Sequence, residues 1–248
     1  MENENVKKQG SSKALLWGLI AVLLVALFCG GVKLADYLYF GNWVVRYKSM
    51  LDNFFGEGNW YVVSDETEKE VIASTEYDEW GTNTVHYKYR NWKISTSDGE
   101  EYIITNHTYL ISRRKSGNKY TPKQALIQQL MFIAHEHAGK IVCDEILSEI
   151  LSESEIACFD VDISYRNGNP KPSVYTKLAK EDWFSYDSTA ADWLSTNLYD
   201  FYLWIRAFDY RVEKLTQEEQ EHIGSCEDEI DEALRNALGD DVDYELSL

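Results

Sequence analysis

The chain has 248 residues and a formal net charge of −18 at pH 7, with 42 acidic side chains against 24 basic ones. Aromatic residues make up 14% of the sequence, which supplies material for a packed core and excludes disorder over most of the chain. Nucleic acid repels so acidic a protein, and the sequence holds no zinc-finger or RNA-binding signature, so we predict no nucleic-acid partner.

One stretch near the N-terminus is far more apolar than the rest, namely residues 14–32, ALLWGLIAVLLVALFCGGV. It carries no charge and lies between Lys13 and Lys33. A helix of ~20 apolar residues spans a hydrocarbon core about 30 Å thick. We therefore predict a single-pass transmembrane helix of the signal-anchor type at 14–32. Residues 1–13 form a short cytoplasmic tail in this prediction, and the remainder of the chain lies outside, because long domains cross membranes largely regardless of charge.

Other interpretations of this segment stay open. A cleaved signal peptide has an apolar core of about 7–15 residues, shorter than this run, although Cys29 and the two glycines after it supply the small residues of a cleavage site. A lipoprotein needs a small residue before its acceptor cysteine, and this chain has Phe28 there. Basic residues flank both ends of the segment in similar number, so charge alone does not fix the orientation.

Beyond the segment, apolar residues at helical spacing predict a juxtamembrane helical stalk over 33–55. Two glycines within 56–59 predict the break between this stalk and the following domain. We expect one extracytoplasmic domain over 56–248, with subdomains 56–151 and 152–248 as an alternative.

The first part of this domain reads as a β-meander. Short strands are predicted at 60–64 and 71–77, and a longer strand at 84–97, with a bulge near Arg90 and Asn91 where the alternation changes phase. The dipeptide Asp98-Gly99 predicts a hairpin turn, after which the chain returns as a strand over 100–111.

A capping box follows at Thr121–Gln124, with Pro122 at the first helical position, and predicts a helix over about 122–151 that bends or breaks at Gly139. Clean alternation over 156–165 predicts a half-buried antiparallel strand.

The C-terminal third holds weaker signals. We predict a strand at 174–184, a short helix within 187–196, and a strand rather than a helix at 198–215 because of its aromatic and branched residues. A second capping box at Thr216 predicts a helix over about 217–238 that Gly239 ends, and then a short acidic tail. The fold class predicted is α+β, a mostly antiparallel sheet with two longer helices.

No side-chain pattern points to a metal or cofactor site. The histidines of His135-Glu136-His137 are two residues apart, about 200° around a helix, so they cannot bind one ion unless the helix breaks at Gly139, and we predict that they lie on the helix surface. The cysteines beyond the anchor are three and widely spaced, which favours free thiols over a disulfide framework, although one bridge stays open: Cys143, Cys158 and Cys226. No catalytic residue is identified, since no nucleophile or phosphate-binding motif is present.

Charge is unevenly distributed along the chain. Basic residues gather between residues 86 and 123, whereas residues 213–245 are strongly acidic. One interpretation is that the two regions neutralise each other in the fold. The other is a basic face for an anionic partner, made of Lys88, Arg90, Lys93, Arg113, Arg114, Lys115 and Lys119.

These features favour a binding protein over an enzyme. We predict a single-pass membrane-anchored domain that contacts protein or anionic components of the cell envelope. A membrane-anchored hydrolase, whose active site is assembled from scattered residues, is the alternative; it requires a pocket in which His or Cys meets carboxylates of perturbed pKa.

Overall fold

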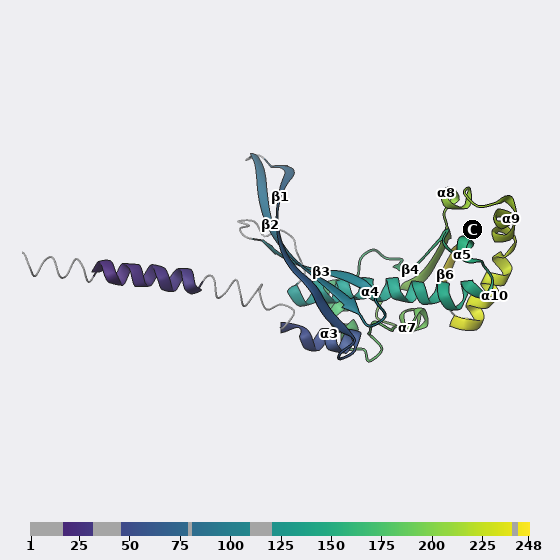
Figure 1. The fold of residues 1–248 in the computed structure, drawn as a ribbon, viewed down its shortest axis with the longest axis horizontal. Coiled ribbons are helices and arrows are strands. Elements are labelled where there is room, and N and C mark those ends of the chain that lie inside the picture. Colours follow the sequence, from purple (N-terminus) through teal and green to yellow (C-terminus); the bar gives the residue numbers. More distant parts are fainter. Residues whose placement is uncertain (1–16, 32–45, 79–80, 110–120, 240–242) are drawn as a thin grey trace, which may run out of the picture. The chain divides into compact units, whose positions relative to one another are not determined.

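The computed structural model (Figure 1) describes residues 17–31, 46–78, 81–109, 121–239 and 243–248, with side chains at all of these except 67–78, 81–89, 106–109 and 122. The chain consists of two compact units, Met1–Ser49 and Met50–Leu248.

In the first unit, residues 17–31 form a helix whose side chains are all exposed, with Trp17 and Phe28 at 69% and 74%. Among the described residues, no helix combines the length and the apolar character that a bilayer crossing demands. The structure therefore does not support the transmembrane helix predicted at 14–32, of which it describes residues 17–31. The remainder of that segment, the tail 1–13 and most of the predicted stalk lie outside the described residues.

The second unit begins within α3 (Lys48–Phe55), which is the end of the predicted stalk. Its apolar residues Leu51, Phe54 and Phe55 are at most 3% exposed. The ring of Phe55 lies 5.5 Å from that of Tyr186, centroid to centroid, so this last part of the stalk is packed into the globular unit. Gly56 ends the helix with a φ of 86°, which confirms the predicted break.

The N-terminal sheet is antiparallel in the order β1 (Trp60–Asp78), β2 (Gly81–Thr96) and β3 (Glu101–Tyr109). The two short strands predicted at 60–64 and 71–77 are one long strand. The hairpin at Asp98-Gly99 is confirmed, and Gly99 has the positive φ of 92° that the turn requires. The bulge predicted at Arg90-Asn91 is wrong: β2 stays in register with β3 there, and the extra residue is Val63 of β1.

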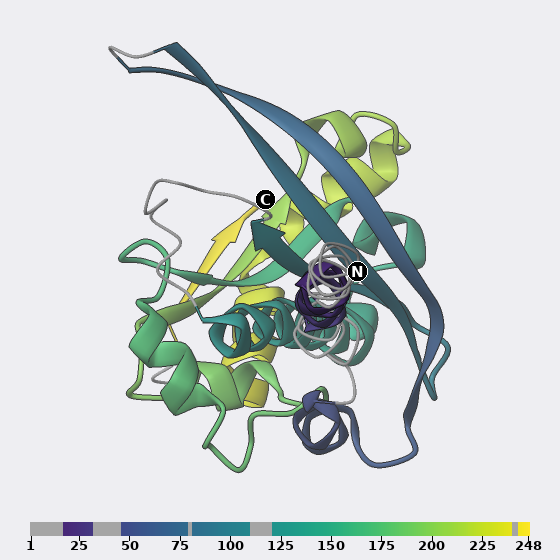
Figure 2. The ribbon, with the colours of Figure 1, turned by 90° about the vertical axis from the view of Figure 1, so that its left-hand side faces the viewer.

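Beyond the end of β3, β1 and β2 continue as a two-stranded ribbon (Figure 2). Their pairing extends to Asp78 and Gly81, whereas β3 reaches only as far as Tyr87 of β2.

The long helix α4 (Pro122–Glu145) begins at the predicted capping box: the Thr121 hydroxyl accepts a hydrogen bond from the backbone of Gln124, whose side chain accepts one from the Thr121 backbone. The helix ends at Glu145, earlier than the predicted end near residue 151. Two short helices follow it, η2 (Leu147–Glu149) and α5 (Glu153–Ile156). The predicted bend at Gly139 is absent. A Cβ at this position would lie 2.2 Å from the carbonyl oxygen of Val161, so the glycine lets a strand approach the helix closely.

Helix α4 covers an edge of each sheet (Figure 1). The Gln129 side chain pairs with the Thr105 backbone of β3 as a strand would, accepting from its N–H at 2.7 Å and donating to its carbonyl at 2.9 Å. Farther along, His135 and Gly139 meet the backbone of β4 at Ile163 and Val161. A covered strand edge cannot pair with another chain, so α4 protects both sheets and joins them.

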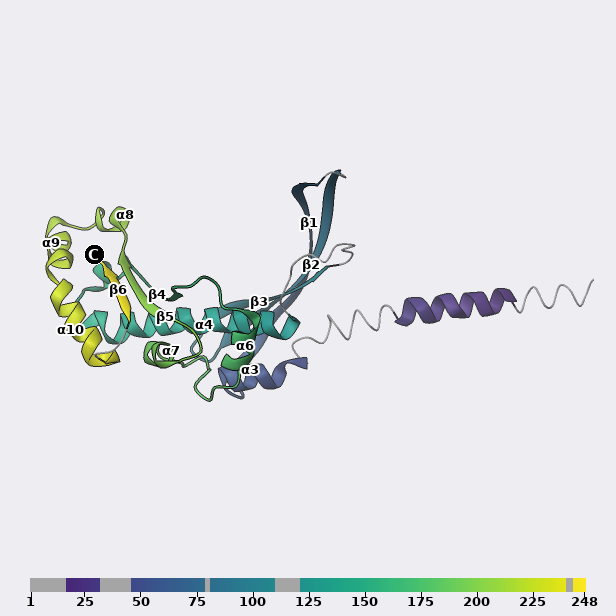
Figure 3. The same cartoon turned by 180° about the vertical axis from the view of Figure 1, so that it is seen from behind.

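The C-terminal sheet has the order β4 (Phe159–Tyr165), β5 (Phe201–Ala207) and β6 (Tyr244–Ser247). The first pair is antiparallel. The strand predicted at 156–165 is confirmed, whereas the strand predicted at 198–215 is confirmed only as far as Ala207, because a short helix follows it. Strands β5 and β6 are parallel. The predicted acidic tail therefore contributes a strand. Helix α10 lies beside it (Figure 3), where the Tyr244 hydroxyl bonds the Asp231 carboxylate.

The segments that connect β4 to β5 and β5 to β6 contain helices. The strand predicted at 174–184 is wrong: Pro172 begins a helix there, α6 (Pro172–Leu178), and its Tyr175 and Leu178 are fully buried one turn apart. The short helix predicted within 187–196 is confirmed as α7 (Ala190–Ser195). The long helix predicted at 217–238 is interrupted at Cys226, so the crossover to β6 contains α8 (Asp209–Val212), α9 (Gln217–Ser225) and α10 (Glu227–Leu238).

The fold class α+β is confirmed, with two three-stranded sheets in place of one. Against the C-terminal sheet, the core is aromatic and centres on Trp193 of α7, which is fully buried. Its ring lies 5.3 Å from that of Phe201 on β5 and 4.2 Å from that of His135 on α4.

Candidate functional site

Two members of the predicted basic face are already paired. Arg90 donates from Nε to the Asp65 carboxylate at 2.6 Å, makes a second contact with it through Nη2, and lies over the Trp92 ring at 5.5 Å. Lys93 forms an ion pair with Glu101 at 2.6 Å. Both pairs lie within the N-terminal sheet, so these two cations are neutralised locally.

The other five members, Lys88, Arg113, Arg114, Lys115 and Lys119, have no described side chains. The structure thus does not test the basic face, which stays a prediction. No ion pair between described residues joins the basic region to the acidic region 213–245. Within the acidic region Asp231 pairs with Arg235, and Asp243 pairs with Arg166.

Of the two histidines of α4, His135 does not lie on the helix surface as predicted, and His137 is half-buried. His135 is 1% exposed, and burial lowers the pKa of its imidazole from 6.5 to about 3. The hydrogen bond with the Ile163 backbone acts in the opposite direction and raises this pKa, but burial has the larger effect. The His137 ring stacks on Tyr186 at 4.0 Å. Among the described residues, no three His, Cys, Asp or Glu side chains are grouped so that they could hold a metal ion.

Tyr186 connects three elements at the hairpin turn between β2 and β3. Its hydroxyl donates to the Asp98 carboxylate at 2.9 Å and lies 3.1 Å from the hydroxyl of Tyr102, while its backbone N–H bonds the carbonyl of Phe54 at 2.7 Å. Burial, together with these hydroxyl contacts, raises the pKa of Tyr186. The network holds the turn against α3 and α4, which is a structural role.

One histidine meets a buried carboxylate, as a hydrolase would require. Glu155 is 3% exposed and its Oε1 lies 2.7 Å from Nδ1 of His222. Although burial opposes it, hydrogen bonds from Ser152 and His222 lower the pKa of Glu155. No hydroxyl or thiol of the described residues bonds the other ring nitrogen of His222. Burial also raises the pKa of Cys143 to about 11, which keeps that thiol protonated.

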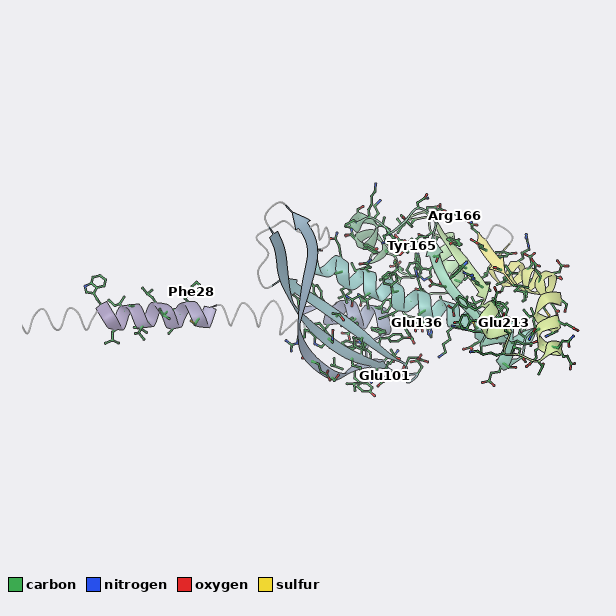
Figure 4. The ribbon with its side chains drawn as sticks, turned by 90° about the horizontal axis from the view of Figure 1, so that it is seen from above. Phe28, Glu101, Glu136, Tyr165, Arg166 and Glu213 are labelled. Atoms are coloured by element: carbon green, nitrogen blue, oxygen red, sulfur yellow. The ribbon has the colours of Figure 1, made fainter. Side chains whose placement is uncertain are left out.

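The C-terminal sheet has one apolar face and one face that carries aromatic and charged side chains. Phe201, Leu203, Ile205 and Ala207 of β5 point into the core and are at most 6% exposed. The alternate residues point the other way: Tyr202 and Trp204 are partly exposed, and Arg206 is exposed. Figure 4 shows Tyr165 and Arg166 at the end of the neighbouring strand β4.

Guanidinium groups link these rings to the aromatic residues of the next segment. Arg206 lies 5.8 Å from the Trp204 ring centroid and 5.3 Å from that of Phe208. Arg211 lies 4.8 Å from the Phe208 ring and 5.6 Å from that of Tyr210, which is 55% exposed. We call this continuous surface the aromatic face; it comprises Tyr202, Trp204, Arg206, Phe208, Tyr210 and Arg211.

Two arginines at its borders are neutralised. Arg166 lies over the Tyr202 ring at 4.8 Å and donates from Nε to Asp243 at 2.7 Å. Arg211 pairs with Asp160 at 3.0 Å. These pairs hold the aromatic rings in place, because each guanidinium is fixed by a carboxylate on one side and by a ring on the other.

Comparisons of the chain with protein-family models, with curated proteins and with solved structures found no match. The aromatic face therefore has to be interpreted from its own chemistry.

Sequence reasoning did not single out this face. The alternation of buried residues at 201, 203, 205 and 207 was visible, and it places residues 202, 204 and 206 together on the opposite side. Glu245 could not be assigned to the same surface, because β6 was predicted to be a solvated tail.

Proposed function

We propose that this protein is a membrane-anchored binding protein, with a short cytoplasmic N-terminus, whose extracytoplasmic unit contacts a protein of the cell envelope through the aromatic face. The aromatic face is the observation that carries the proposal. Trp, Tyr and Arg are the residues that dominate the energy of protein interfaces, and here they form one continuous surface. Isolated exposed apolar side chains need no explanation, but an organised group of large rings on a sheet does.

The anchor rests on the apolar segment 14–32. Fifteen of its residues are helical and exposed in the structure, and none of them is charged. Keeping apolar surface in contact with water costs about 25 cal/mol of free energy per Å², so this segment needs an apolar environment. A bilayer supplies that environment for a helix of this composition.

Site-specific photo-crosslinking tests the contact. The residue p-benzoylphenylalanine replaces Tyr202 in the full-length chain, which is then irradiated in membranes of cells that naturally make it. We expect a discrete protein adduct from position 202. The same group at Glu227, an exposed position on α10, serves as the control and should give no such adduct.

The Trp204→Ala variant sharpens this experiment. The adduct from position 202 should decrease strongly in this variant, because the largest ring of the surface is lost. Equal adducts from positions 202 and 227, or an adduct that Trp204→Ala leaves unchanged, would contradict the proposal.

A further inference from the structure

The centre of the aromatic face has a symmetrical arrangement across three strands. Trp204 on β5 is directly opposite Asp162 on β4 and Glu245 on β6 in the strand register. Directly paired residues of neighbouring strands point to the same side of a sheet. The indole therefore lies between two carboxylates, and both acidic residues are exposed.

These two carboxylates differ from the other acids of the face. Asp160 and Asp243 are neutralised by Arg211 and Arg166, whereas neither Asp162 nor Glu245 forms an ion pair with a described residue. Although Asp162 as a whole is exposed, partial desolvation of its carboxylate, with the charges of Asp160 and Glu136 nearby, raises its pKa. The centre of the face thus has an excess of negative charge.

Resting on the proposed function, we propose that the partner presents a basic segment to this face, with a Lys or Arg side chain placed over Trp204 between Asp162 and Glu245. An indole ring is the best π-system for a cation, and the two carboxylates accept hydrogen bonds from the same ammonium or guanidinium group. Arg206, two residues along the same strand, already lies over this ring at 5.8 Å from its centroid, so the indole accommodates a cation.

The charge of the whole chain acts in the same direction. With a net charge of −18, the protein attracts a basic segment and repels an acidic one before contact is made. Because the pairs on either side of Trp204 are neutralised, an additional positive charge at this position would meet the carboxylates of Asp162 and Glu245.

The experiment measures binding of a fluorescent twelve-residue peptide, with four lysines spaced by alanine and serine, to the detergent-solubilised full-length chain by fluorescence anisotropy at 150 mM salt. A second peptide of the same sequence has every lysine acetylated, which keeps the length and removes the charge. We expect saturable binding of the lysine peptide and at least about tenfold weaker binding of the acetylated one.

Variants assign the binding to the face. Trp204→Ala and the double variant Asp162→Asn/Glu245→Gln should each weaken the lysine peptide at least about fivefold. Tyr61→Ala removes an aromatic side chain that is 61% exposed on the other sheet, and Glu227→Gln removes an exposed charge of α10; both should bind as the parent chain does.

Failure of this inference is separable from failure of the proposed function. If the lysine peptide does not bind, binds as well when acetylated, or is insensitive to the two variants of the face, the basic-segment inference is overturned. A crosslink from position 202 that persists alongside that result leaves the face as a binding surface for a partner of other chemistry.

Discussion

The imidazole of His135 is kept neutral by its surroundings. It lies in the core beside Trp193, where transfer of a charge from water is costly, so its pKa falls to about 3. In the unfolded chain the same group has its ordinary pKa of 6.5. Below pH 6.5 the unfolded state therefore binds a proton that the folded state does not, and acid favours unfolding down to about pH 3.

We expect the free energy of unfolding to fall by up to about 1.4 kcal/mol for each pH unit below 6.5 through this group alone. Urea denaturation of the purified chain at several values between pH 7 and 4.5 measures the slope. In the His135→Phe variant, which keeps a ring against Trp193 and does not titrate, the slope should decrease by about one proton. Equal slopes in the two proteins would show that His135 is not the buried neutral group described here.

Gly139 lies inside a helix, where alanine is usually more stable than glycine. Helix propensity alone favours Gly139→Ala by roughly 1 kcal/mol. The added Cβ would meet the Val161 carbonyl at 2.2 Å, however, and neither α4 nor β4 can move without disturbing the other. We therefore expect Gly139→Ala to lower the free energy of unfolding by about 2 kcal/mol or more.

Gly224→Ala is the matched control, since Gly224 lies in α9 with open space at its Cβ position. It should leave stability unchanged or raise it by roughly 0.5–1 kcal/mol. Chemical denaturation of both variants measures the difference, and a Gly139→Ala protein as stable as the Gly224→Ala protein would refute the close approach of α4 and β4.

At the scale of elements, Gln129 completes the edge of β3. Replacing it with alanine leaves the Thr105 N–H and carbonyl without the side chain that bonds them, so we expect Gln129→Ala to lower the free energy of unfolding by about 1–2 kcal/mol. Amide hydrogen exchange at Thr105 should accelerate more than exchange at Ile163 in β4. The neighbouring Gln128, whose side chain forms no hydrogen bond with described residues, provides the control: Gln128→Ala should change neither quantity, and equal effects of the two variants would be evidence against the edge role.

Local sequence signals predicted the elements whose chemistry is complete within a few residues. The capping boxes at Thr121 and Thr216 and the turn at Asp98-Gly99 need only neighbours in the chain, and all three are confirmed. The strands at Phe159–Tyr165 and Phe201–Ala207 were predictable from alternation, because one face of each is buried.

Elements that depend on distant partners were not predictable in this way. The C-terminal residues Tyr244–Ser247 form a strand because β5 offers them an edge, although their own composition reads as a solvated tail. The bulge at Val63 is a property of the β1–β2 register, so the sequence of β2 alone misplaced it. The same dependence hid the candidate site, since Asp162, Trp204 and Glu245 come from three strands that only the fold brings together.

At the scale of the whole molecule, our account assigns separate tasks to the two units. Under the proposed function, the first would attach the protein to a membrane through residues 14–32, and the second would bind a partner through the outward face of its C-terminal sheet. The carboxylates of Asp162 and Glu245 at the centre of that face are negative, as is the net charge of the chain. Attachment would hold the face near its partner and raise the effective concentration of the contact.

The central claim is that this chain is a binding protein held on a membrane by its N-terminal segment, and extraction of membranes at alkaline pH tests it most directly. We predict that the full-length chain stays in the membrane pellet, because extraction at high pH releases proteins held by surface contacts but not a segment embedded in hydrocarbon. The double variant Leu23→Lys/Leu24→Lys should pass into the supernatant, since each charge at the centre of the segment costs about 2.5–3.5 kcal/mol on insertion. Release of the unaltered full-length chain into the supernatant would contradict the account.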